Sequence, residues 1–287
     1  FTTFRLGGPC ACLLTCETGP QLVDAISMLD RLRLPFLAMG GGSNLLVSDR
    51  GYDGIILRFI SKTPDIRVTG EVVEVSGSTL LDDLVDYTVR QGLEGLVYAS
   101  GIPGTVGGAI AGNAGAYGNQ IGDTLISARL IDERGSVREE SREALQFAYR
   151  SSRLQQSRET VLSARLQLRR SDPDEMEGQR EEILELRKAK HPDWKAVPTA
   201  GSFFKNIEPT SSAERRQAAG WFLEQAGAKS MSVGGARVFE KHANIIVADQ
   251  GCSAQDVLDL SRRMAEAVKQ EFGLVLAPEV RLVGSFQ

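Results

Sequence analysis

The sequence contains no long hydrophobic run, whereas a helix that spans a membrane needs about 20 apolar residues. It also has no basic segment followed by an apolar stretch near its start, which is the pattern of a signal peptide. It also lacks an excess of positive charge, because 33 lysines and arginines are interspersed with 37 aspartates and glutamates, for a net charge of −4. A nucleic-acid-binding protein would need a basic face. We therefore expect a cytoplasmic protein with a small-molecule ligand and with neither membrane nor nucleic-acid partners.

Cysteine and histidine are scarce as well. The chain has two histidines and four cysteines, of which Cys10, Cys12 and Cys16 are close together and Cys252 is isolated. No C-x-x-C pair occurs, and such pairs are typical of structural zinc sites. The sequence therefore predicts reduced thiols and no metal site.

Two common phosphate-binding signatures are missing, namely G-x-G-x-x-G and G-x-x-x-x-G-K-[ST]. Glycine is instead concentrated in Gly40-Gly41-Gly42, which follows an apolar run, and in residues 101–118, where seven of 18 residues are glycine and none is charged. Main chain without side chains can approach an anion closely, so both segments predict an extended ligand such as a dinucleotide. A tight turn explains the first segment equally well, whereas a flexible linker fits the second poorly because bulky apolar residues interrupt it.

Apolar periodicity predicts an α+β protein that mixes helices with short strands. Ser253 and Asp256 have the spacing of a helix capping box, and Gly273 is expected to end the last helix. The glycine-rich residues 101–118 and the stretch 200–206 are expected to be irregular. The predicted helices are 20–33, 79–91, 180–188, 213–225 and 253–272, and the predicted strands are 34–38, 54–59, 71–76, 128–132, 161–168 and 244–248.

Several motifs occur in the order typical of one enzyme family. They are GGGSNLLV (40–47), GIPGTVGGAIAGNAGAYG (101–118), YRSS (149–152), AGSFFKN (200–206) and PEVR (278–281). The first two resemble a flavin-binding fold of the vanillyl-alcohol-oxidase type, and the ordered set, from about Thr2 to Val283, resembles the UDP-N-acetylenolpyruvoylglucosamine reductase family. Only 51 residues, none of them tyrosine, separate Arg150 from Ser202. The chain thus resembles the shorter branch of that family, which lacks a tyrosine-lid insertion.

The resemblance implies an architecture and a reaction. The architecture is α+β, with vanillyl-alcohol-oxidase-type FAD-binding domains and a smaller α/β substrate-binding domain. Its expected parts are a first FAD-binding subdomain at 1–62, to which the C-terminal strand can return, a second at 63–178, and the substrate-binding domain at 189–287. The implied reaction uses NADPH and FAD to reduce UDP-N-acetylglucosamine enolpyruvate to UDP-N-acetylmuramate, a precursor of peptidoglycan.

The resemblance also implies binding residues. The residues expected to hold FAD are Gly40, Gly41, Gly42, Ser43, Asn44, Leu45, Ser100, Gly101, Ile102, Pro103, Gly104, Gly107, Gly108, Asn113 and Arg187. The residues expected to contact the nucleotide sugar are Tyr117, Lys190, Asn206 and His242.

Arg150, Ser202 and Glu279 match the catalytic positions of the family. Hydride addition to the enolpyruvyl group leaves negative charge on its carboxylate, and a guanidinium such as that of Arg150 can bind a carboxylate through two hydrogen bonds. Glu279 can assist only as a protonated hydrogen-bond donor, because an ionised carboxylate would repel the substrate. Ser202 is expected to supply the proton, helped by nearby cations such as Lys205.

Each of these residues also has an ordinary structural explanation. Arg150 could form a surface ion pair, Ser202 could cap a turn, and Glu279 could lie at a strand edge. Tyr117 could be a packing aromatic and His242 a structural histidine.

Two other functions are compatible with the glycine segments, and the sequence carries no signal for an oligomeric state. One is an oxidase or dehydrogenase of the same flavin superfamily that acts on an alcohol or hydroxy acid. Its covalent-flavin members would need a histidine or cysteine near the ring, and neither glycine segment contains one. The other is a regulatory module that binds a flavin or nucleotide without turnover, but such a module has no need of a proton donor or a carboxylate-binding arginine.

Overall fold

The computed structural model describes residues 1–209 and 216–287, which divide into two compact units. Unit 1 comprises residues 1–10, 42–53 and 187–287, and unit 2 comprises residues 11–41 and 54–186. Unit 1 is thus assembled from three separate stretches of chain, so its fold depends on pairing between segments that are distant in sequence. Among the described residues, no helix combines the length and the apolar character that a membrane crossing requires.

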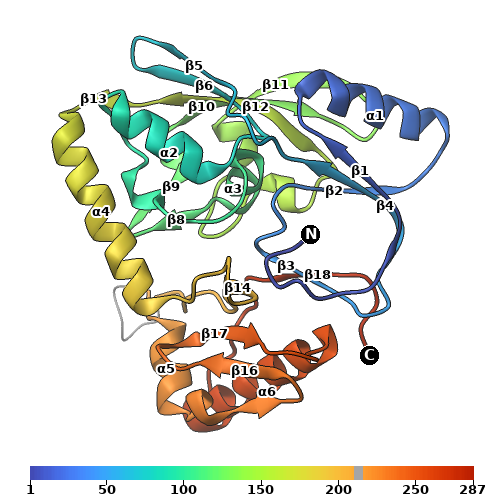
Figure 1. Ribbon diagram of the computed structural model, residues 1–287, viewed down its shortest axis with the longest axis vertical. Helices are drawn as coiled ribbons and strands as arrows, with labels where there is room; N and C mark the ends of the chain where they lie inside the picture. Colours follow the sequence, from blue (N-terminus) through green and yellow to red (C-terminus); the bar gives the residue numbers. More distant parts are fainter. Residues whose placement is uncertain (210–215) are drawn as a thin grey trace. The chain divides into compact units, whose positions relative to one another are not determined.

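Unit 2 contains most of the β-structure (Figure 1). Its strands are β1 (Cys10–Cys16), β2 (Phe36–Met39), β4 (Tyr52–Phe59), β5 (Ile66–Thr69), β6 (Val72–Ser76), β7 (Leu93–Glu94), β8 (Gly115–Ala116), β9 (Asn119–Gln120), β10 (Leu125–Ile131), β11 (Val137–Ser141), β12 (Thr160–Gln167) and β13 (Arg169–Arg170). A five-stranded sheet has the order β11-β10-β12-β6-β5 and is antiparallel throughout. A three-stranded sheet has the order β1-β4-β2, and β2 runs parallel to β4.

The helices of unit 2 contribute apolar residues to its cores. They are α1 (Gly19–Arg31), α2 (Leu81–Arg90), α3 (Val106–Gly112) and α4 (Pro173–Lys190), whose last residues belong to unit 1. On α2, Leu81, Leu84, Val85 and Val89 are buried at helical spacing, and they share one core with α3 and the five-stranded sheet. A smaller core lies under α1 and is formed by Cys16, Leu22, Ile26, Leu57, Phe59, Ile131 and Leu162.

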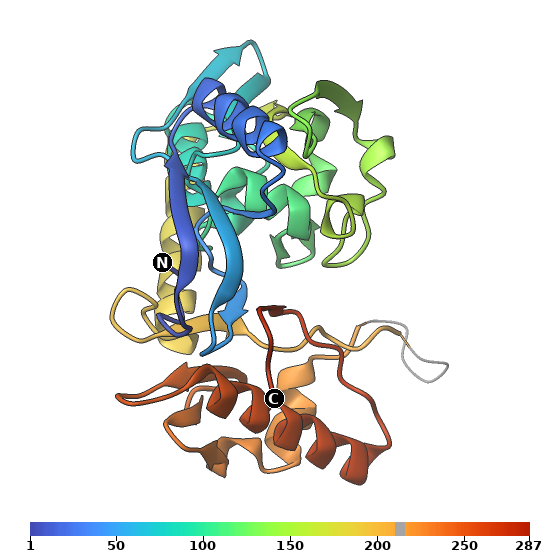
Figure 2. The same ribbon diagram turned by 90° about the vertical axis from the view of Figure 1, so that its right-hand side faces the viewer.

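Unit 1 is built on a four-stranded sheet. Its elements are β3 (Leu45–Val47), β14 (Thr199–Ser202), α5 (Ala219–Gln225), β15 (Ser232–Val233), β16 (Ala236–Phe239), β17 (His242–Ala248), α6 (Ala254–Phe272) and β18 (Arg281–Val283). The sheet has the order β14-β17-β16-β15, and α5 and α6 pack against it and against each other, as both views show (Figures 1 and 2). β18 pairs in parallel with β3, so the end of the chain is bonded to residues 45–47.

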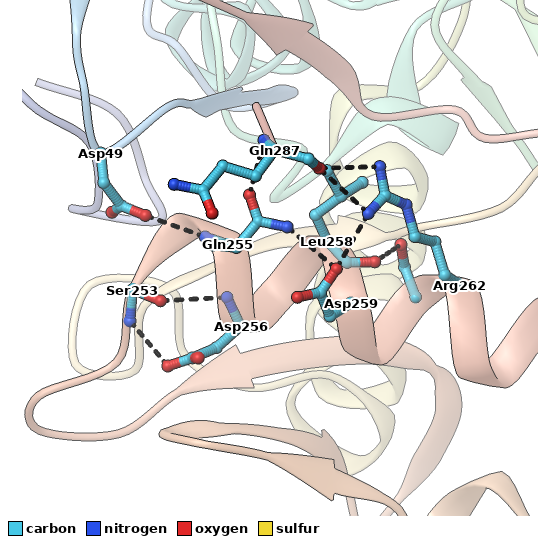
Figure 3. A network of polar contacts seen from close by, with 9 residues as sticks. Asp49, Ser253, Gln255, Asp256, Leu258, Asp259, Arg262 and Gln287 are labelled. Atoms are coloured by element: carbon cyan, nitrogen blue, oxygen red, sulfur yellow. Dashed lines mark hydrogen bonds and ion pairs between the residues drawn. The ribbon is translucent and has the colours of Figure 1, made fainter. Parts of the chain in front are cut away.

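The N-terminus of α6 is capped twice (Figure 3). The Ser253 hydroxyl accepts the N–H of Asp256 at 3.0 Å, and the Asp256 carboxylate accepts the N–H of Ser253 at 3.0 Å, which completes a capping box. The Asp49 carboxylate accepts two further N–H groups, from Ala254 at 2.8 Å and Gln255 at 3.0 Å. Because a helix begins with unpaired N–H groups and a positive dipole end, these carboxylates stabilise α6 and tie residues 42–53 to it.

The strongest helix predictions are confirmed. The expected helices 20–33, 79–91 and 253–272 correspond to α1, α2 and α6, and the capping box and the terminal Gly273 are both present. The helix expected at 180–188 is real but begins earlier, at Pro173.

Two expectations of irregular structure are wrong. Residues 106–112, inside the second glycine segment, form α3, because Thr105 caps the turn and buried Val106, Ala109 and Ile110 give it an apolar side. Residues 200–202 belong to β14, because β17 provides a pairing partner that the sequence does not reveal. The helix expected at 213–225 is seen as α5 from Ala219, and residues 213–215 lie outside the described residues.

We predict that Ser253→Ala lowers the free energy of unfolding by about 1 kcal/mol, because the N–H of Asp256 loses its acceptor. Thermal denaturation should show this as a fall in Tm of about 2–4 °C. Ser232→Ala, at an exposed serine on the neighbouring β15, is the control and should change stability by less than about 0.5 kcal/mol. Equal Tm values for the two variants would contradict the capping role.

Candidate functional site

The two glycine segments predicted to bind one ligand meet within unit 2. A Cβ atom built on Gly41 would lie 3.1 Å from the Cα of Gly104, and one built on Gly40 would collide with the side chain of Thr105. At Gly41, main chain therefore lies against main chain, and a side chain at either glycine would force its neighbour to shift. The resulting surface offers peptide groups without charge, which is the kind of surface that a pyrophosphate can approach.

The first amides of the helical part of the second segment already have acceptors within the protein. The N–H groups of Val106 and Gly107 donate to the carbonyls of Thr79 and Gly77, at 2.9 and 3.0 Å. The N–H of Gly108 donates to the Thr105 hydroxyl at 3.2 Å. These three amides already have protein acceptors, and so do two amides of the loop before α3: the N–H of Gly101 donates to Asp82 at 2.8 Å and that of Ile102 donates to Ala99 at 3.0 Å.

Arg150 occupies the corner of a tight turn. Ala148 and Ser151 exchange two main-chain hydrogen bonds of 3.0 and 3.1 Å, and Arg150 has a left-handed backbone with φ of 52°. The turn is anchored to the end of α3, because the Asn113 amide donates to the carbonyl of Ala148 at 2.8 Å and the Ser152 hydroxyl donates to α3 at 2.8 Å. A non-glycine residue at such a φ is uncommon and is found where surrounding contacts hold it.

Asn113 is a buried residue that connects the end of α3 to the turn carrying Arg150. It is 1% exposed, and its carbonyl oxygen accepts the N–H of Gly122 at 3.1 Å while its amide also reaches Gln120 at 2.9 Å. Its side chain thus fixes the main chain around Arg150, which is a structural contribution beside the cofactor contact expected from the sequence. Tyr117, in contrast, is 57% exposed and available to a ligand.

Tyr98 carries a buried hydroxyl for which the described residues provide no hydrogen-bond partner. Burial raises the pKa of this phenol, Asp123 raises it further, and the positive charge of Arg150 lowers it. Buried polar groups usually have a partner, so an orphaned hydroxyl under the influence of Arg150 fits a region that binds a polar ligand.

Ser202 lies just after an irregularity in its strand. The register between β14 and β17 shifts between Thr199 and Ser202, and Gly201 has a left-handed φ of 75°, which glycine adopts without strain. Bulges of this kind redirect the next side chain and are frequent next to active sites. Ser202 is half-buried and is held opposite Ile245 of β17.

Glu279 is brought to the same part of unit 1 by main-chain bonds. Its N–H donates to the carbonyl of Phe203 at 2.8 Å, so Glu279 lies beside the residue that follows Ser202. Its own carbonyl accepts the Asn44 side-chain amide at 3.1 Å. Within unit 1, the structure therefore brings together Ser202, Glu279 and Asn44, three of the residues predicted from separate motifs.

Asn244 holds this arrangement and was not among the predicted site residues. Its side-chain oxygen accepts the N–H of Phe204 at 2.9 Å, and its side-chain nitrogen donates to the carbonyl of the same residue at 2.8 Å. Its main-chain carbonyl accepts the N–H of Phe203 at 2.8 Å. A buried asparagine in an apolar strand was the signal that could have identified it, since buried amides need fixed partners.

The two histidines of the chain face each other in unit 1. The ring centroids of His191 and His242 are 5.4 Å apart, and Nδ1 of His242 accepts the N–H of Asn244 at 3.2 Å. Burial, Arg187, His242 and Lys190, in that order, lower the pKa of His191 to about 4. Burial also lowers the pKa of His242. Both rings are thus neutral at pH 7, and His242 is held in one orientation.

All of the predicted site residues fall into the two units as follows. Unit 2 holds Gly40, Gly41, Ser100, Gly101, Ile102, Pro103, Gly104, Gly107, Gly108, Asn113, Tyr117 and Arg150. Unit 1 holds Gly42, Ser43, Asn44, Leu45, Arg187, Lys190, Ser202, Asn206, His242 and Glu279. The Asn206 side chain accepts the N–H of Ala219 at 3.2 Å and so caps α5. Among residues 1–209 and 216–287, no three histidine, cysteine or acidic side chains are placed to hold a metal ion.

We predict that Asn244→Ala destabilises the protein by about 2–4 kcal/mol, because two buried main-chain groups of Phe204 lose their partners at once. Urea denaturation measures the change. Asn119→Ala removes an exposed amide and serves as the control, with an expected change below about 0.5 kcal/mol. If Asn244→Ala lost as little stability as the control, the Asn244 amide would not be needed to hold the main chain of Phe204.

The histidine pair predicts a pH dependence of stability. In the unfolded chain a histidine has a pKa of about 6.5, whereas the pKa of folded His191 is about 4. Between these values the unfolded state binds more protons, so stability should fall as the pH drops from about 6.5 to 4 and should gain nothing from this group above that window. In His191→Gln the loss of Tm between pH 7 and pH 5 should be smaller than in the unaltered protein, and parallel curves would contradict the assignment.

Comparison with known proteins places these features in a family. An FAD binding domain model matches residues 10–141, and a model for the C-terminal domain of UDP-N-acetylenolpyruvoylglucosamine reductase matches residues 191–283.

Full-length relatives agree with these domain matches. The chain is 36% identical over 284 residues to the UDP-N-acetylenolpyruvoylglucosamine reductase of Caldanaerobacter subterraneus subsp. tengcongensis, covering 99% of this chain and 90% of the relative. It is 35% identical to that of Clostridium botulinum strain Alaska E43, covering 98% and 89%. The crystal structure of the reductase from Thermus caldophilus superposes with a TM-score of 0.81 at 32% identity, covering 99% and 96%. The chain therefore belongs to the UDP-N-acetylenolpyruvoylglucosamine reductase family, whose members are FAD-dependent oxidoreductases of peptidoglycan synthesis.

Proposed function

We propose that this chain reduces UDP-N-acetylglucosamine enolpyruvate to UDP-N-acetylmuramate with NADPH as the electron source. Membership of the reductase family supports the reaction. The single structural observation that carries the proposal is the meeting of the two uncharged glycine segments, because it builds the main-chain surface that a flavin dinucleotide needs.

The residues present fit FAD. Gly41 and Gly104 lie close together and are both half-buried, so their main chain is proposed to face the pyrophosphate. In unit 1 the residues proposed to hold FAD are Gly42, Ser43, Asn44, Leu45 and Arg187. In unit 2 they are Gly40, Gly41, Ser100, Gly101, Ile102, Pro103, Gly104, Gly107, Gly108 and Asn113. Bound FAD supplies a hydride acceptor for NADPH and a hydride donor for the enolpyruvyl group.

Arg150 is proposed to bind the carboxylate of the enolpyruvyl group. When a hydride adds to the terminal carbon, the electrons of the double bond move towards this carboxylate and increase its negative charge. A guanidinium remains charged and binds such a group through two hydrogen bonds, so its contribution grows as the charge develops. The turn that carries Arg150 is already fixed by Asn113 and Ser152, which reduces the cost of orienting the side chain.

Ser202 is proposed to donate the proton that the adjacent carbon then takes up. A serine hydroxyl is a weak acid, so the developing alkoxide needs positive charge or a hydrogen-bond donor close to it. Lys205 follows three residues later on the same segment, whose main chain Asn244 holds at Phe204. Glu279 lies beside this segment and is proposed to donate a hydrogen bond to the substrate carboxylate in its protonated form.

The nucleotide sugar is proposed to contact Tyr117, Lys190, Asn206 and His242. Tyr117 and Lys190 are exposed, and a diphosphate would attract the ammonium group of Lys190. The neutral, oriented ring of His242 can donate a hydrogen bond from Nε2, because Nδ1 already accepts one.

The absorbance of the purified protein tests the function directly. A yellow protein that NADPH bleaches without oxygen and that UDP-N-acetylglucosamine enolpyruvate then reoxidises is the expected result. Bleaching by hydroxy acids or alcohols instead would indicate an oxidase of the same superfamily. A colourless protein that does not take up FAD would refute both enzymes.

Ser202→Ala separates the two half-reactions. We expect reduction of the flavin by NADPH to remain nearly unchanged, while reoxidation by the substrate slows about 10²–10⁴-fold because the proton donor is missing. Stopped-flow absorbance measures both steps. Ser232→Ala, at an exposed serine of the same unit, should leave both rates unchanged. Equal losses in both steps for Ser202→Ala would remove Ser202 from its assigned role.

A further inference from the structure

The first turn of α2 lies against the loop 101–105 that leads into α3. The N–H of Leu81 donates to the carbonyl of Gly104 at 3.0 Å, and Leu80 and Thr105 form an isolated antiparallel bridge. Leu80, at the N-cap position of α2, makes no side-chain hydrogen bond to the helix. The start of α2 is therefore organised by this loop.

A carboxylate fixes the other end of the same loop. The Oδ1 atom of Asp82 accepts the N–H of Gly101 at 2.8 Å, although the two residues are 19 positions apart. Gly101 has a left-handed φ of 71°, and Ile102 and Pro103 follow it before the second anchor at Gly104. The loop is thus held at both ends by adjacent residues of α2, at Gly101 through the Asp82 side chain and at Gly104 through the main chain.

Arg180 of α4 holds the carboxylate in place. Its guanidinium donates to the same Oδ1 atom of Asp82 at 2.9 Å, and the side chains of Arg180 and Asp82 are 9% and 43% exposed. An ion pair between two exposed side chains contributes little to stability. When one charge of the pair is buried, however, removing its partner leaves that buried charge uncompensated, which is costly. The same oxygen of Asp82 thus accepts from both the buried guanidinium and the N–H of Gly101, so the ion pair holds the carboxylate in the position that binds the loop.

We infer that Asp82 and Arg180 are positioning residues for the cofactor, which hold loop 101–105 in its FAD-binding conformation before FAD arrives. This inference rests on the proposed function, because that function assigns the loop to FAD. A loop that is already ordered loses less conformational entropy on binding, so the pair increases affinity without touching the ligand. Neither residue belongs to a glycine segment, and neither was expected from the sequence to take part in binding.

The test is an FAD titration of the apoprotein, prepared from the full chain by removing flavin, with flavin fluorescence and visible circular dichroism as readouts. We expect Asp82→Ala to raise the Kd for FAD about tenfold or more, because a charge-assisted hydrogen bond to the loop is lost. Asp82→Asn keeps a neutral acceptor of the same shape and should give an intermediate Kd. It also serves as the second variant if the alanine protein does not fold.

Two comparisons separate positioning from a general effect on stability. Asp86→Ala removes a carboxylate from the same helix, where it forms a surface ion pair with Arg90 at 3.0 Å, and it should leave the Kd unchanged. The Asp82→Ala/Arg180→Met double variant should bind FAD about as weakly as Asp82→Ala alone, since Arg180 acts through Asp82. Additive losses would show that Arg180 acts by another route.

The outcomes distinguish this inference from the proposed function. A folded Asp82→Ala protein that binds FAD as tightly as the unaltered protein, while both reduce the substrate, overturns the positioning role alone. An equal loss of affinity in Asp86→Ala also overturns it. If the unaltered protein takes up no FAD, the proposed function fails and the inference fails with it.

Discussion

The main chain at Gly41 lies directly against the main chain at Gly104, Gly40 lies against the side chain of Thr105, and the arrangement of unit 2 around its candidate site depends on these contacts. Only residues without a Cβ atom permit so close an approach. Thr105, which faces Gly40, also caps α3, and Asn113 at the other end of α3 anchors the turn that carries Arg150. One seven-residue helix thus connects the glycine contact with the proposed catalytic arginine.

A similar device operates in unit 1. Buried Asn244 replaces a missing strand partner by bonding both main-chain groups of Phe204, just as buried Asn113 bonds Ala148 and Gly122 in unit 2. An asparagine side chain offers a donor and an acceptor in the geometry of a peptide group, so it can hold irregular main chain that no strand or helix pairs. Arg150 lies on such an irregular segment, and Ser202 ends β14 directly before the segment that Asn244 holds, so the main chain at both residues is fixed by a buried asparagine close by.

The helices that the sequence predicted best are those that local information specifies. In α2 and α6, apolar residues repeat at helical spacing, and α6 also has its capping box and terminal glycine within the same stretch. The prediction failed for α3. Its glycines lower the helical propensity of the segment, and the packing of buried Val106 and Ile110 compensates for that loss. It failed for β14 as well, because its strand partner β17 lies about 40 residues later in the chain.

The sequence by itself determined the family, the mixed architecture and the segments that carry the chemistry, because glycine-rich turns and ordered motifs are readable one after another. Only the tertiary structure decided which of these segments touch. It brought Gly41 to Gly104 and Glu279 to Phe203, and it gave Asn244, Asp82 and Arg180 their roles as supports. Those roles arise from hydrogen bonds between residues up to 98 positions apart. No local pattern encodes such a bond, since its partners are chosen by the packing of the whole unit.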